Sequence, residues 1–352
     1  MASGGAALKN AWTGGQYSLV RALACGTMAV AIARSSIPQA GAEGFDPAAA
    51  LLALVALLVA VGLGAGARAL SAILATAVSV GAGEGIGGAA AQYAGLWLSL
   101  HILVPRAPYG SAAAAGREDP RGSWSMPAWQ PATCLALFVL SRLFCSVHAL
   151  YDGNQVMAGI FFFLGMLALS RSTALVGWSL SAGLGIGLAL EGHGSLSAAW
   201  FLHLFTFQPA WIPPRDASET STVFYDGSCA LCHGVVRFLL AEDAADPPRF
   251  RIAPLRGEAF TSRVTQSERT RLPDSVVVAR GREMLVRSAA VIAILDALGG
   301  LWWMLAAFMR LFPTAFADTV YDFIAARRYR WFGRRSEACP LMPAALRGRI
   351  DP

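Results

Sequence analysis

The 352-residue sequence predicts an α-helical transmembrane bundle of about eight spans followed by a smaller α/β domain. The apolar share of 55% and the charged share of 14% differ from those of soluble domains, which are about 45–50% and about 25%. Charge is also unevenly distributed, because residues 48–104 contain only Arg68 and Glu84 as charged residues. After residue 221 the long apolar runs give way to short alternating strand and helix patterns.

The first 210 residues contain apolar stretches near the length of about 20 residues that a membrane-spanning helix needs. We predict spans near 17–37, 48–66, 68–83, 86–104, 128–150, 154–170, 172–190 and 195–210. Residues 1–210 are therefore predicted to form a membrane domain. Residues 211–221 combine prolines with polar residues and are predicted to be a linker, which leaves 222–352 as the second domain.

The positions of the arginines predict the orientation, because cytoplasmic loops collect Lys and Arg. With the N-terminus inside, the predicted inner loops contain Lys9, Arg68, Arg106, Arg117, Arg121, Arg171 and Arg215. An even number of spans returns the chain to the cytoplasm, so residues 222–352 are expected there. Lys9 is the single lysine among 28 basic residues, a bias that suits a bacterium. We therefore predict a multi-pass protein of a bacterial inner membrane.

The net charge of +6 agrees with this loop pattern and with contact between the chain and anionic lipid of the bilayer. No nucleic-acid motif accompanies the charge, so nucleic acid is not an expected partner.

Residues 222–300 predict a small α/β domain. TVFYD at 222–226 is a β-branched and aromatic strand, and ALCHGVVRFLLAED at 230–243 has apolar residues at helical spacing. Three further strands and a closing helix are predicted at 250–255, 274–280, 282–288 and 288–300. A β-α-β half followed by a β-β-α half is the element order of a minimal thioredoxin-like domain.

The segment CALCH at 229–233 is compatible with three chemistries. A C-x-x-C after a strand matches a redox dithiol, and a cysteine at a helix start meets backbone N–H groups that favour its thiolate. We therefore predict Cys229 as the nucleophile and Cys232, one turn later, as the resolving thiol. C-x-x-C-H also matches a c-type haem site with His233 as axial ligand, which requires an exported domain. A zinc site would use Cys229, Cys232 and Cys339, but a single C-x-x-C lacks the usual second pair.

No metal and no cofactor other than the redox-active disulfide is therefore expected, and His233 is expected to be exposed on the first helix turns.

The stretch Tyr225-Asp226-Gly227-x-Cys229-x-Leu231-Cys232 resembles the signature of the DCC family of thiol-disulfide oxidoreductases. The resemblance continues through the segments 273–278, 287–290, 321–329 and 330–340. It implies a thioredoxin-like fold, thiol-disulfide exchange at the two cysteines and a thiol or disulfide partner.

Two further residues are candidates beside the dithiol. Pro273 precedes a predicted strand, where the resemblance implies a cis-proline that faces the dithiol; the alternative is an ordinary turn proline. Asp226 could receive a cysteine proton during exchange, although Asp before Gly is also a common turn pair.

In the predicted membrane domain, Arg142, His148 and His203 are ionisable residues in apolar surroundings, which is costly and often functional. They are candidates for binding a quinone or another cofactor, and hydrogen bonding within the bundle is the alternative. The N-terminal half, with VRALACG and HLFTFQPAWIPP, resembles the membrane domains attached to DCC modules and, distantly, the transmembrane part of vitamin K-dependent carboxylases. That distant resemblance assigns no catalytic residue.

These observations lead to two hypotheses from different classes. The first is a membrane-anchored thiol-disulfide oxidoreductase that exchanges electrons with a protein or small-thiol partner. The second is a structural or assembly subunit of a larger bacterial membrane complex, in which the thioredoxin-like domain is a docking module.

Overall fold

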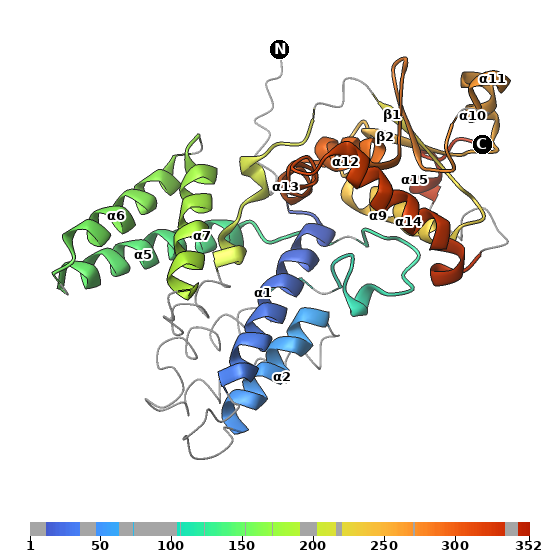
Figure 1. Ribbon diagram of the computed structural model, residues 1–352. Helices are drawn as coiled ribbons and strands as arrows, with labels where there is room; N and C mark the ends of the chain where they lie inside the picture. The colour runs from blue at the N-terminus through green and yellow to red at the C-terminus, as the bar shows by residue number, and fades with distance from the viewer. Residues whose placement is uncertain are drawn as a thin grey trace, which may run out of the picture. The chain divides into compact units, whose positions relative to one another are not determined.

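The computed structural model describes residues 12–35, 47–62, 73, 104–105, 107–122, 124–151, 153–170, 172–190, 203–215, 220–269, 272–334 and 344–352 (Figure 1). The chain divides into two compact units. The N-terminal unit comprises Met1–Trp12, Tyr17–Ala115 and Trp124–Trp211, and the C-terminal unit comprises Thr13–Gln16, Gly116–Ser123 and Ile212–Pro352. We describe each unit by itself.

Helices are the regular elements of the described N-terminal residues. They are α1 (Gly14–Ser35), α2 (Pro47–Val61), α5 (Trp129–Tyr151), α6 (Gln155–Leu169) and α7 (Ala174–Leu190), with short 3₁₀ turns η2 (Ala112–Ala114), η3 (Leu204–Thr206) and η4 (Pro209–Trp211). Helix α6 packs against both α5 and α7 (Figure 1). The helices predicted near 17–37, 48–66, 128–150, 154–170 and 172–190 are confirmed as helices, while those near 68–83 and 86–104 fall almost wholly outside the described residues. The described part of the span predicted at 195–210, residues 203–210, contains the 3₁₀ turns η3 and η4 in place of a continuous helix.

The described helices do not support the predicted bundle of eight spans. By length and apolar composition, one of them can cross a bilayer, at Ala132–Tyr151, and the bent pair Gly300–Met309 and Thr314–Phe332 qualifies only if both helices are taken as one span. Helices α2 and α6 have 15 residues each, a rise of about 22 Å against a hydrocarbon core of about 30 Å. Core helices of soluble proteins and signal sequences also satisfy these criteria.

The C-terminal unit is built on a four-stranded mixed sheet. Its strands are β1 (Ser221–Tyr225), β2 (Phe250–Pro254), β3 (Val277–Arg280) and β4 (Glu283–Val286), in the order β2-β1-β3-β4. Strand β1 runs parallel to β2 and antiparallel to β3, and β3 runs antiparallel to β4. Helix α9 (Ala230–Glu242) connects β1 to β2, and α12 (Arg287–Leu298) follows β4. This unit fits a thioredoxin-like fold, and the predicted strands and helices are confirmed.

The central strand β1 is covered on both faces, since every residue from Thr222 to Tyr225 is buried. Phe224 packs against Phe260 of α10 (Glu258–Arg263), with ring centroids 4.9 Å apart. The cluster around them contains Ala253, Val264, Val277 and Ala279. Burial on both faces explains why the consecutive residues Val223, Phe224 and Tyr225 of β1 are all large and apolar, with no alternation of polar residues.

Strand β2 would leave an unpaired edge, but the end of the chain pairs with it. After the short helix α15 (Ala344–Arg347), the Ile252 backbone N–H donates to the Arg349 carbonyl at 3.0 Å, and the Asp351 N–H donates to the Ile252 carbonyl at 2.8 Å. The pairing satisfies backbone groups that an open edge would expose.

Five helices of this unit were not predicted as separate elements: α10, α11 (Gln266–Arg269), α13 (Gly300–Met309), α14 (Thr314–Phe332) and α15. Gly299, with φ +69°, ends α12, and Pro313 precedes α14. Helix α14 contacts both α12 and α9 (Figure 1).

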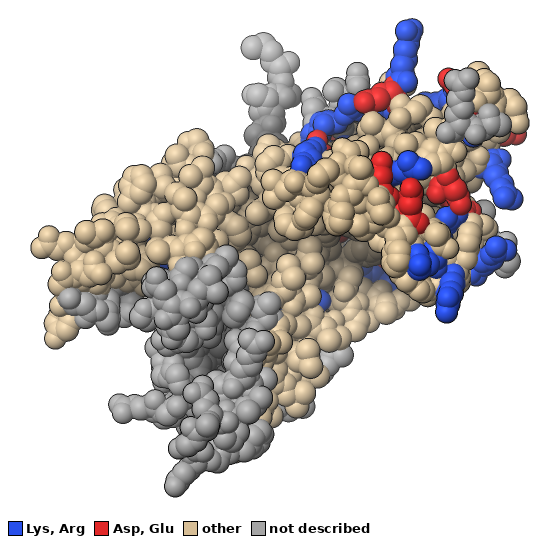
Figure 2. Space-filling model, viewed as in Figure 1, with Lys and Arg blue, Asp and Glu red and all other residues tan. Residues whose placement is uncertain are grey.

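Charged side chains gather over the elements of the C-terminal unit, and the face seen over α5, α6 and α7 is largely uncharged (Figure 2).

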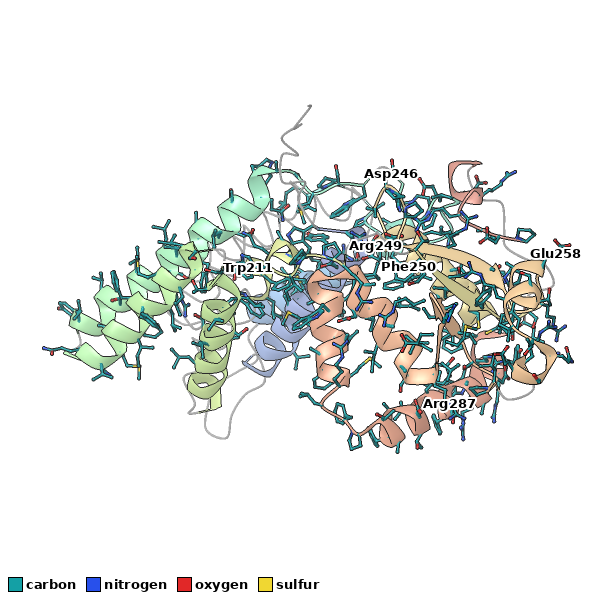
Figure 3. All side chains as sticks on the ribbon, turned by 90° about the horizontal axis from the view of Figure 1, so that it is seen from above. Trp211, Asp246, Arg249, Phe250, Glu258 and Arg287 are labelled. Carbon is teal, nitrogen blue, oxygen red and sulfur yellow. The ribbon has the colours of Figure 1, made fainter. Side chains whose placement is uncertain are left out.

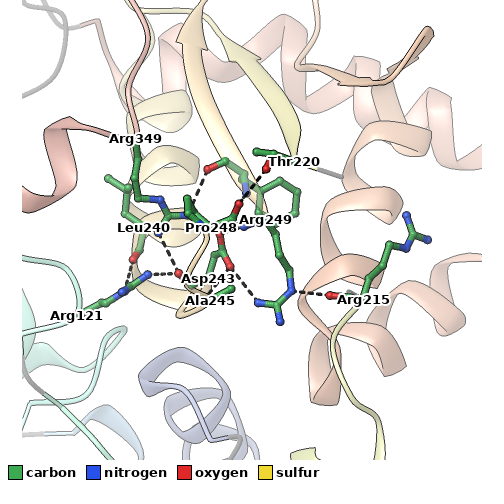
Figure 4. Close-up of polar contacts among 10 residues, drawn as sticks. Arg121, Arg215, Thr220, Leu240, Asp243, Ala245, Pro248, Arg249 and Arg349 are labelled. Atoms are coloured by element: carbon green, nitrogen blue, oxygen red, sulfur yellow. Dashed lines mark hydrogen bonds and ion pairs between the residues drawn. The ribbon is translucent and has the colours of Figure 1, made fainter. Parts of the chain in front are cut away.

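A buried carboxylate, Asp243, joins the end of α9 to the start of β2 (Figure 4). Its side chain is 0% exposed and accepts hydrogen bonds from the Arg249 guanidinium at 3.1 Å and from the Arg249 and Phe250 backbone N–H groups at 2.9 and 3.2 Å. The Arg349 guanidinium from the chain end also pairs with it. Arg249 and Phe250 lie side by side where β2 begins (Figure 3). One acidic side chain therefore connects three segments of the unit.

Replacement of Asp243 is expected to destabilise the C-terminal unit. Asp243→Asn leaves the buried Arg349 and the half-buried Arg249 without their counter-charge, which costs about 3–5 kcal/mol of unfolding free energy. The control is Asp351→Asn, because the Arg251–Asp351 pair is more exposed and such pairs contribute about 0–1 kcal/mol. Urea denaturation of the purified chain measures both, and equal effects of the two substitutions would contradict the role given to Asp243.

Candidate functional site: a dithiol at the start of a helix

The two cysteines of the CALCH segment are brought together where β1 leads into α9. Cys229 is the N-cap residue of α9, with extended backbone angles of φ −101° and ψ 121°. Its Sγ accepts a hydrogen bond from the Cys232 backbone N–H at 3.4 Å. A sulfur thus occupies the position where a serine or aspartate oxygen commonly caps a helix. The predicted placement of Cys229 at the helix start agrees with this geometry.

Cys232 lies one turn into the helix and is half-buried. Burial raises the pKa of its thiol to about 12, assisted by a hydrogen bond with the Cys229 side chain and by the negative charges of Cys229 and Asp226; a backbone hydrogen bond from Asp226 opposes the rise. Cys232 therefore holds its proton at neutral pH. This is the state expected of a resolving thiol that waits beside a nucleophile.

Cys229 is 0% exposed. The segment that follows α14 lies across it: the Ala230 N–H donates to the Gly333 carbonyl at 3.3 Å, and Arg334 forms a β-bridge with Cys229. Gly333 has φ +84°, a conformation that favours glycine. The sulfur at the helix start is thus less accessible than Cys232.

His233 is 2% exposed, so the predicted exposure of this residue is wrong. Its Nε2–H donates to the Gly227 carbonyl at 2.8 Å, and its ring packs edge-on against Tyr225. The side chain turns back beneath the loop that precedes α9, because that loop places a carbonyl within its reach. A ring held in this way braces the dithiol turn and does not present Nε2 to a haem iron.

Asp226 accepts several hydrogen bonds in the turn before Cys229. Ser228 donates from its backbone N–H at 2.9 Å and from its hydroxyl at 2.7 Å, and the Tyr329 hydroxyl and the Arg328 guanidinium donate to the second carboxylate oxygen. Burial acts to raise the pKa of Asp226, but the hydrogen bonds from Tyr329, Ser228 and Arg328 outweigh it and lower the pKa to about 2. Asp226 is therefore ionised at neutral pH and is a weak proton acceptor.

Arg328 and Tyr321 of α14 border the dithiol from a distant part of the sequence. Arg328 is 7% exposed; its Nη2 donates to both Asp274 oxygens at 2.8 Å and to Asp226 at 3.2 Å. The Tyr321 hydroxyl accepts the Val276 N–H at 2.8 Å. Burial raises the pKa of Tyr321, and the negative charge of the Cys232 thiolate adds to the rise. Residues 321–329 are part of the resemblance to the DCC family, but their pattern in the sequence assigned no role to Tyr321 or Arg328.

The prediction of a cis bond at Pro273 is wrong. The Leu272–Pro273 peptide is trans, and the cis X-Pro bond in the described part of the chain is Asp246–Pro247. Pro273 lies four residues before β3, in a turn where its carbonyl accepts the Ser275 N–H at 2.8 Å. The residue directly before β3 is Val276, and its backbone N–H donates to the Tyr321 hydroxyl.

No group of three or more His, Cys, Asp or Glu side chains that could hold a metal occurs among the described residues. Cys339, the third ligand of the zinc alternative, lies outside them.

Two of the three candidate residues of the N-terminal unit, Arg142 and His203, lie against the same ring, that of Phe138 in α5. His203 is buried; its Nε2 donates to the Trp178 carbonyl at 3.0 Å, its Nδ1 lies 3.4 Å from the Thr206 hydroxyl, and its ring stacks on Trp178. Arg142 lies over the ring of Phe138, at 5.6 Å, and over a second ring from α6. His148 belongs to α5, but its side chain lies outside the described residues. Quinone binding stays a prediction.

Comparison with known proteins identifies relatives of the C-terminal residues. Residues 223–334 match the family described as DCC1-like thiol-disulfide oxidoreductase. The Bacillus subtilis protein YuxK is 32% identical over 134 residues, which cover 37% of this chain and 93% of YuxK. A chloroplastic DCC family protein of Arabidopsis thaliana is 33% identical over 135 residues, covering 35% of this chain and 76% of that protein. No solved structure matches the chain significantly.

The ion pair of Asp226 is expected to make stability depend on pH. Its pKa falls from the ordinary 3.8 to about 2 in the folded chain, so its stabilisation is present above pH 4 and is lost as the pH falls toward 2. Because Asp226 is partly exposed, we expect Asp226→Asn to cost about 1 kcal/mol at pH 7 and less at pH 2. Urea denaturation at both pH values measures the difference, with Asp322→Asn in the exposed Arg287–Asp322 pair as control.

Alkylation of Cys232 is expected to report its raised pKa. Only the thiolate reacts, so the iodoacetamide rate should rise about tenfold per pH unit from pH 7 toward pH 11. Cys229→Ser removes the neighbouring sulfur and its charge, so the rate at a given pH should increase. Mass spectrometry of the peptide containing Cys232 measures both rates; a plateau near pH 8 in the unaltered chain would contradict the assigned environment.

Proposed function

The chain belongs to the DCC1-like thiol-disulfide oxidoreductase family, and we propose that Cys229 and Cys232 transfer two electrons to a disulfide of a partner. A domain of this family implies protein or small-molecule thiols and disulfides as partners. One observation carries the proposal: Sγ of Cys229 caps α9 and accepts the N–H of the other cysteine at 3.4 Å. A backbone donor and the positive end of a helix both stabilise negative charge placed beside them, which suits a nucleophilic sulfur at this position.

In the proposed reaction the Cys229 thiolate attacks one sulfur of a partner disulfide. The partner S–S bond breaks, one partner thiolate leaves and takes a proton from solvent, and the other partner sulfur is joined to Cys229. Cys232 then loses its proton and attacks Sγ of Cys229, which releases the second partner thiolate. The dithiol is oxidised to a disulfide and the partner disulfide is reduced to two thiols; an external dithiol returns the two electrons.

The surroundings of Cys232 support this order of steps. Part of the rise in its pKa comes from the hydrogen bond with Cys229 and from the charge of that sulfur. Formation of the mixed disulfide removes the charge, so the pKa of Cys232 falls when the thiol is needed as a nucleophile. Asp226, with a pKa of about 2, does not retain this proton at neutral pH. We therefore assign the proton to the departing partner thiolate and to solvent.

Attack by Cys229 requires the covering segment to move. The contacts of Gly333 and Arg334 with Ala230 and Cys229 occupy the helix start, where a partner chain would lie. Displacement of these two residues frees the Ala230 N–H, which would then be available to the partner backbone.

The finer proposal is that this domain is anchored in a bacterial inner membrane and faces the cytoplasm. The apolar composition, the arginines of the predicted inner loops and the helix segment Ala132–Tyr151 support it. A cytosolic dithiol favours reduction of partner disulfides over their net formation.

The burial of Cys229 favours a second candidate function, a docking module in a larger membrane complex. Gentle detergent extraction followed by size-exclusion chromatography distinguishes the two. Co-migration with a stoichiometric complex that survives replacement of both cysteines supports the docking role.

Replacing the cysteines tests the proposed chemistry directly. With the full chain, excess dithiothreitol and a peptide carrying a glutathione disulfide, Cys229→Ser should lower the reduction rate about 100-fold or more above the background of the reductant. When dithiothreitol is left out, Cys232→Ser should instead accumulate a mixed disulfide on Cys229, visible as added mass under non-reducing conditions. Cys145→Ser, on helix α5, is the matched control and should retain the rate. Unchanged reduction by Cys229→Ser would rule out the assignment.

A further inference from the structure

The exposed large apolar side chains of the C-terminal unit are concentrated on one pair of helices. Among the described residues of this unit, all of them lie on α13, on α14 or in the connection between the two. They are Trp303, Leu305, Phe308, Leu311, Phe312, Phe316, Val320, Phe323, Ile324, Trp331 and Phe332. We call this set the α13–α14 face. Soluble surfaces expose apolar residues singly, so a contiguous set of this kind indicates an interaction surface.

The face is continuous and aromatic. The rings of Phe308 and Phe312 lie 5.3 Å apart, and those of Phe312 and Phe316 lie 5.5 Å apart, which joins the end of α13 to the start of α14. Further along α14, the rings of Phe323 and Trp331 lie 5.8 Å apart. Figure 3 shows the side chains projecting from these helices near the labelled Arg287.

The charges on this side of α14 are basic. Positions 316, 320, 323, 327 and 331 follow the three-to-four-residue spacing of one helix face, so Arg327 stands among the apolar residues and Arg330 beside them. The Arg327 guanidinium lies 3.7 Å from the centre of the Phe323 ring. The acidic residues of α14 lie elsewhere: Asp318 accepts the Ser288 N–H, and Asp322 pairs with Arg287.

These features fit a helix that lies on a membrane rather than one that crosses it. Helix α14 contains the charged residues Asp318, Asp322, Arg327, Arg328 and Arg330, which oppose insertion into the hydrocarbon core. Arg328 is also buried in the cluster beside the dithiol, so the opposite side of α14 is held by the domain. An apolar face with aromatic residues and arginines is the composition of interfacial helices.

We propose that the C-terminal unit binds an anionic lipid bilayer through the α13–α14 face, with Arg327 and Arg330 at the level of the lipid phosphates. Charge complementarity selects this occupant: the apolar rings enter the boundary between headgroups and acyl chains, and the guanidinium groups pair with phosphate. Docking brings α14 to the bilayer, and the same helix supplies Arg328, which binds Asp226 in the turn before the dithiol. The inference does not depend on the dithiol chemistry proposed above.

Hydroxyl-radical footprinting of the full chain tests this inference. The chain is reconstituted into phosphatidylcholine vesicles with and without phosphatidylglycerol, and oxidation of Phe316, Phe323 and Trp331 is measured by mass spectrometry. We expect oxidation of these three residues to fall at least threefold when phosphatidylglycerol is present, and the protection to be lost at high salt; each arginine contributes about a fivefold preference for the anionic surface. Phe250, which is buried in the core, serves as the internal reference for folding.

Charge reversal provides the matched variants. The double variant Arg327→Glu and Arg330→Glu should lose the lipid-dependent protection, whereas the control Arg256→Glu and Arg282→Glu, at exposed positions outside α13 and α14, should retain it. Protection that is equal with and without phosphatidylglycerol would mean that the face is covered by another part of the chain, and protection that grows with protein density would indicate a second copy. Either result, or no protection in any vesicle, overturns the proposal.

Discussion

The hydrogen bond from the Cys232 backbone N–H to Sγ of Cys229 is the interaction on which the candidate site depends. It exists because β1 ends at Tyr225 and a four-residue turn delivers Cys229 to the N-cap of α9. The same helix start places the second cysteine one turn away and gives the two sulfurs unequal surroundings. The inequality matters for exchange, since one sulfur must react as an anion while the other keeps its proton.

The turn that carries Cys229 is held from two sides. His233 donates to the Gly227 carbonyl from within α9, and Arg328 and Tyr329 bind Asp226 from α14. Because Asp226 is ionised in this cluster, it acts as the anchor of the turn and not as a store for a proton. This cluster fixes the turn that carries the dithiol, and the residues directly after α14 cover Cys229. The position of the turn and the exposure of Cys229 therefore both depend on α14 and the residues that follow it.

Helix α14 therefore has two different sides. One side supplies Tyr321 and Arg328 to the dithiol, and the other exposes Phe316, Phe323 and Trp331. In a soluble domain the second side would be polar, because exposed rings gain nothing from water. The two sides connect the chemistry of the site to a surface that a lipid bilayer can occupy, and they explain why a helix with five charged residues also carries such large apolar groups.

The sequence by itself determined the local features of this protein. The strands β1 to β4, the helices α9 and α12 and several N-terminal helices follow from periodicity, and the closeness of Cys229 and Cys232 follows from their spacing within one helical turn. Tertiary structure decided the rest: the meeting of Asp226 with Arg328, the burial of His233 and Cys229 and the trans bond at Pro273. The meeting of Asp226 with Arg328 and the covering of Cys229 by Arg334 depend on contacts between residues far apart along the chain. Hydropathy cannot register such contacts, because it records what each residue prefers and not which residue it meets.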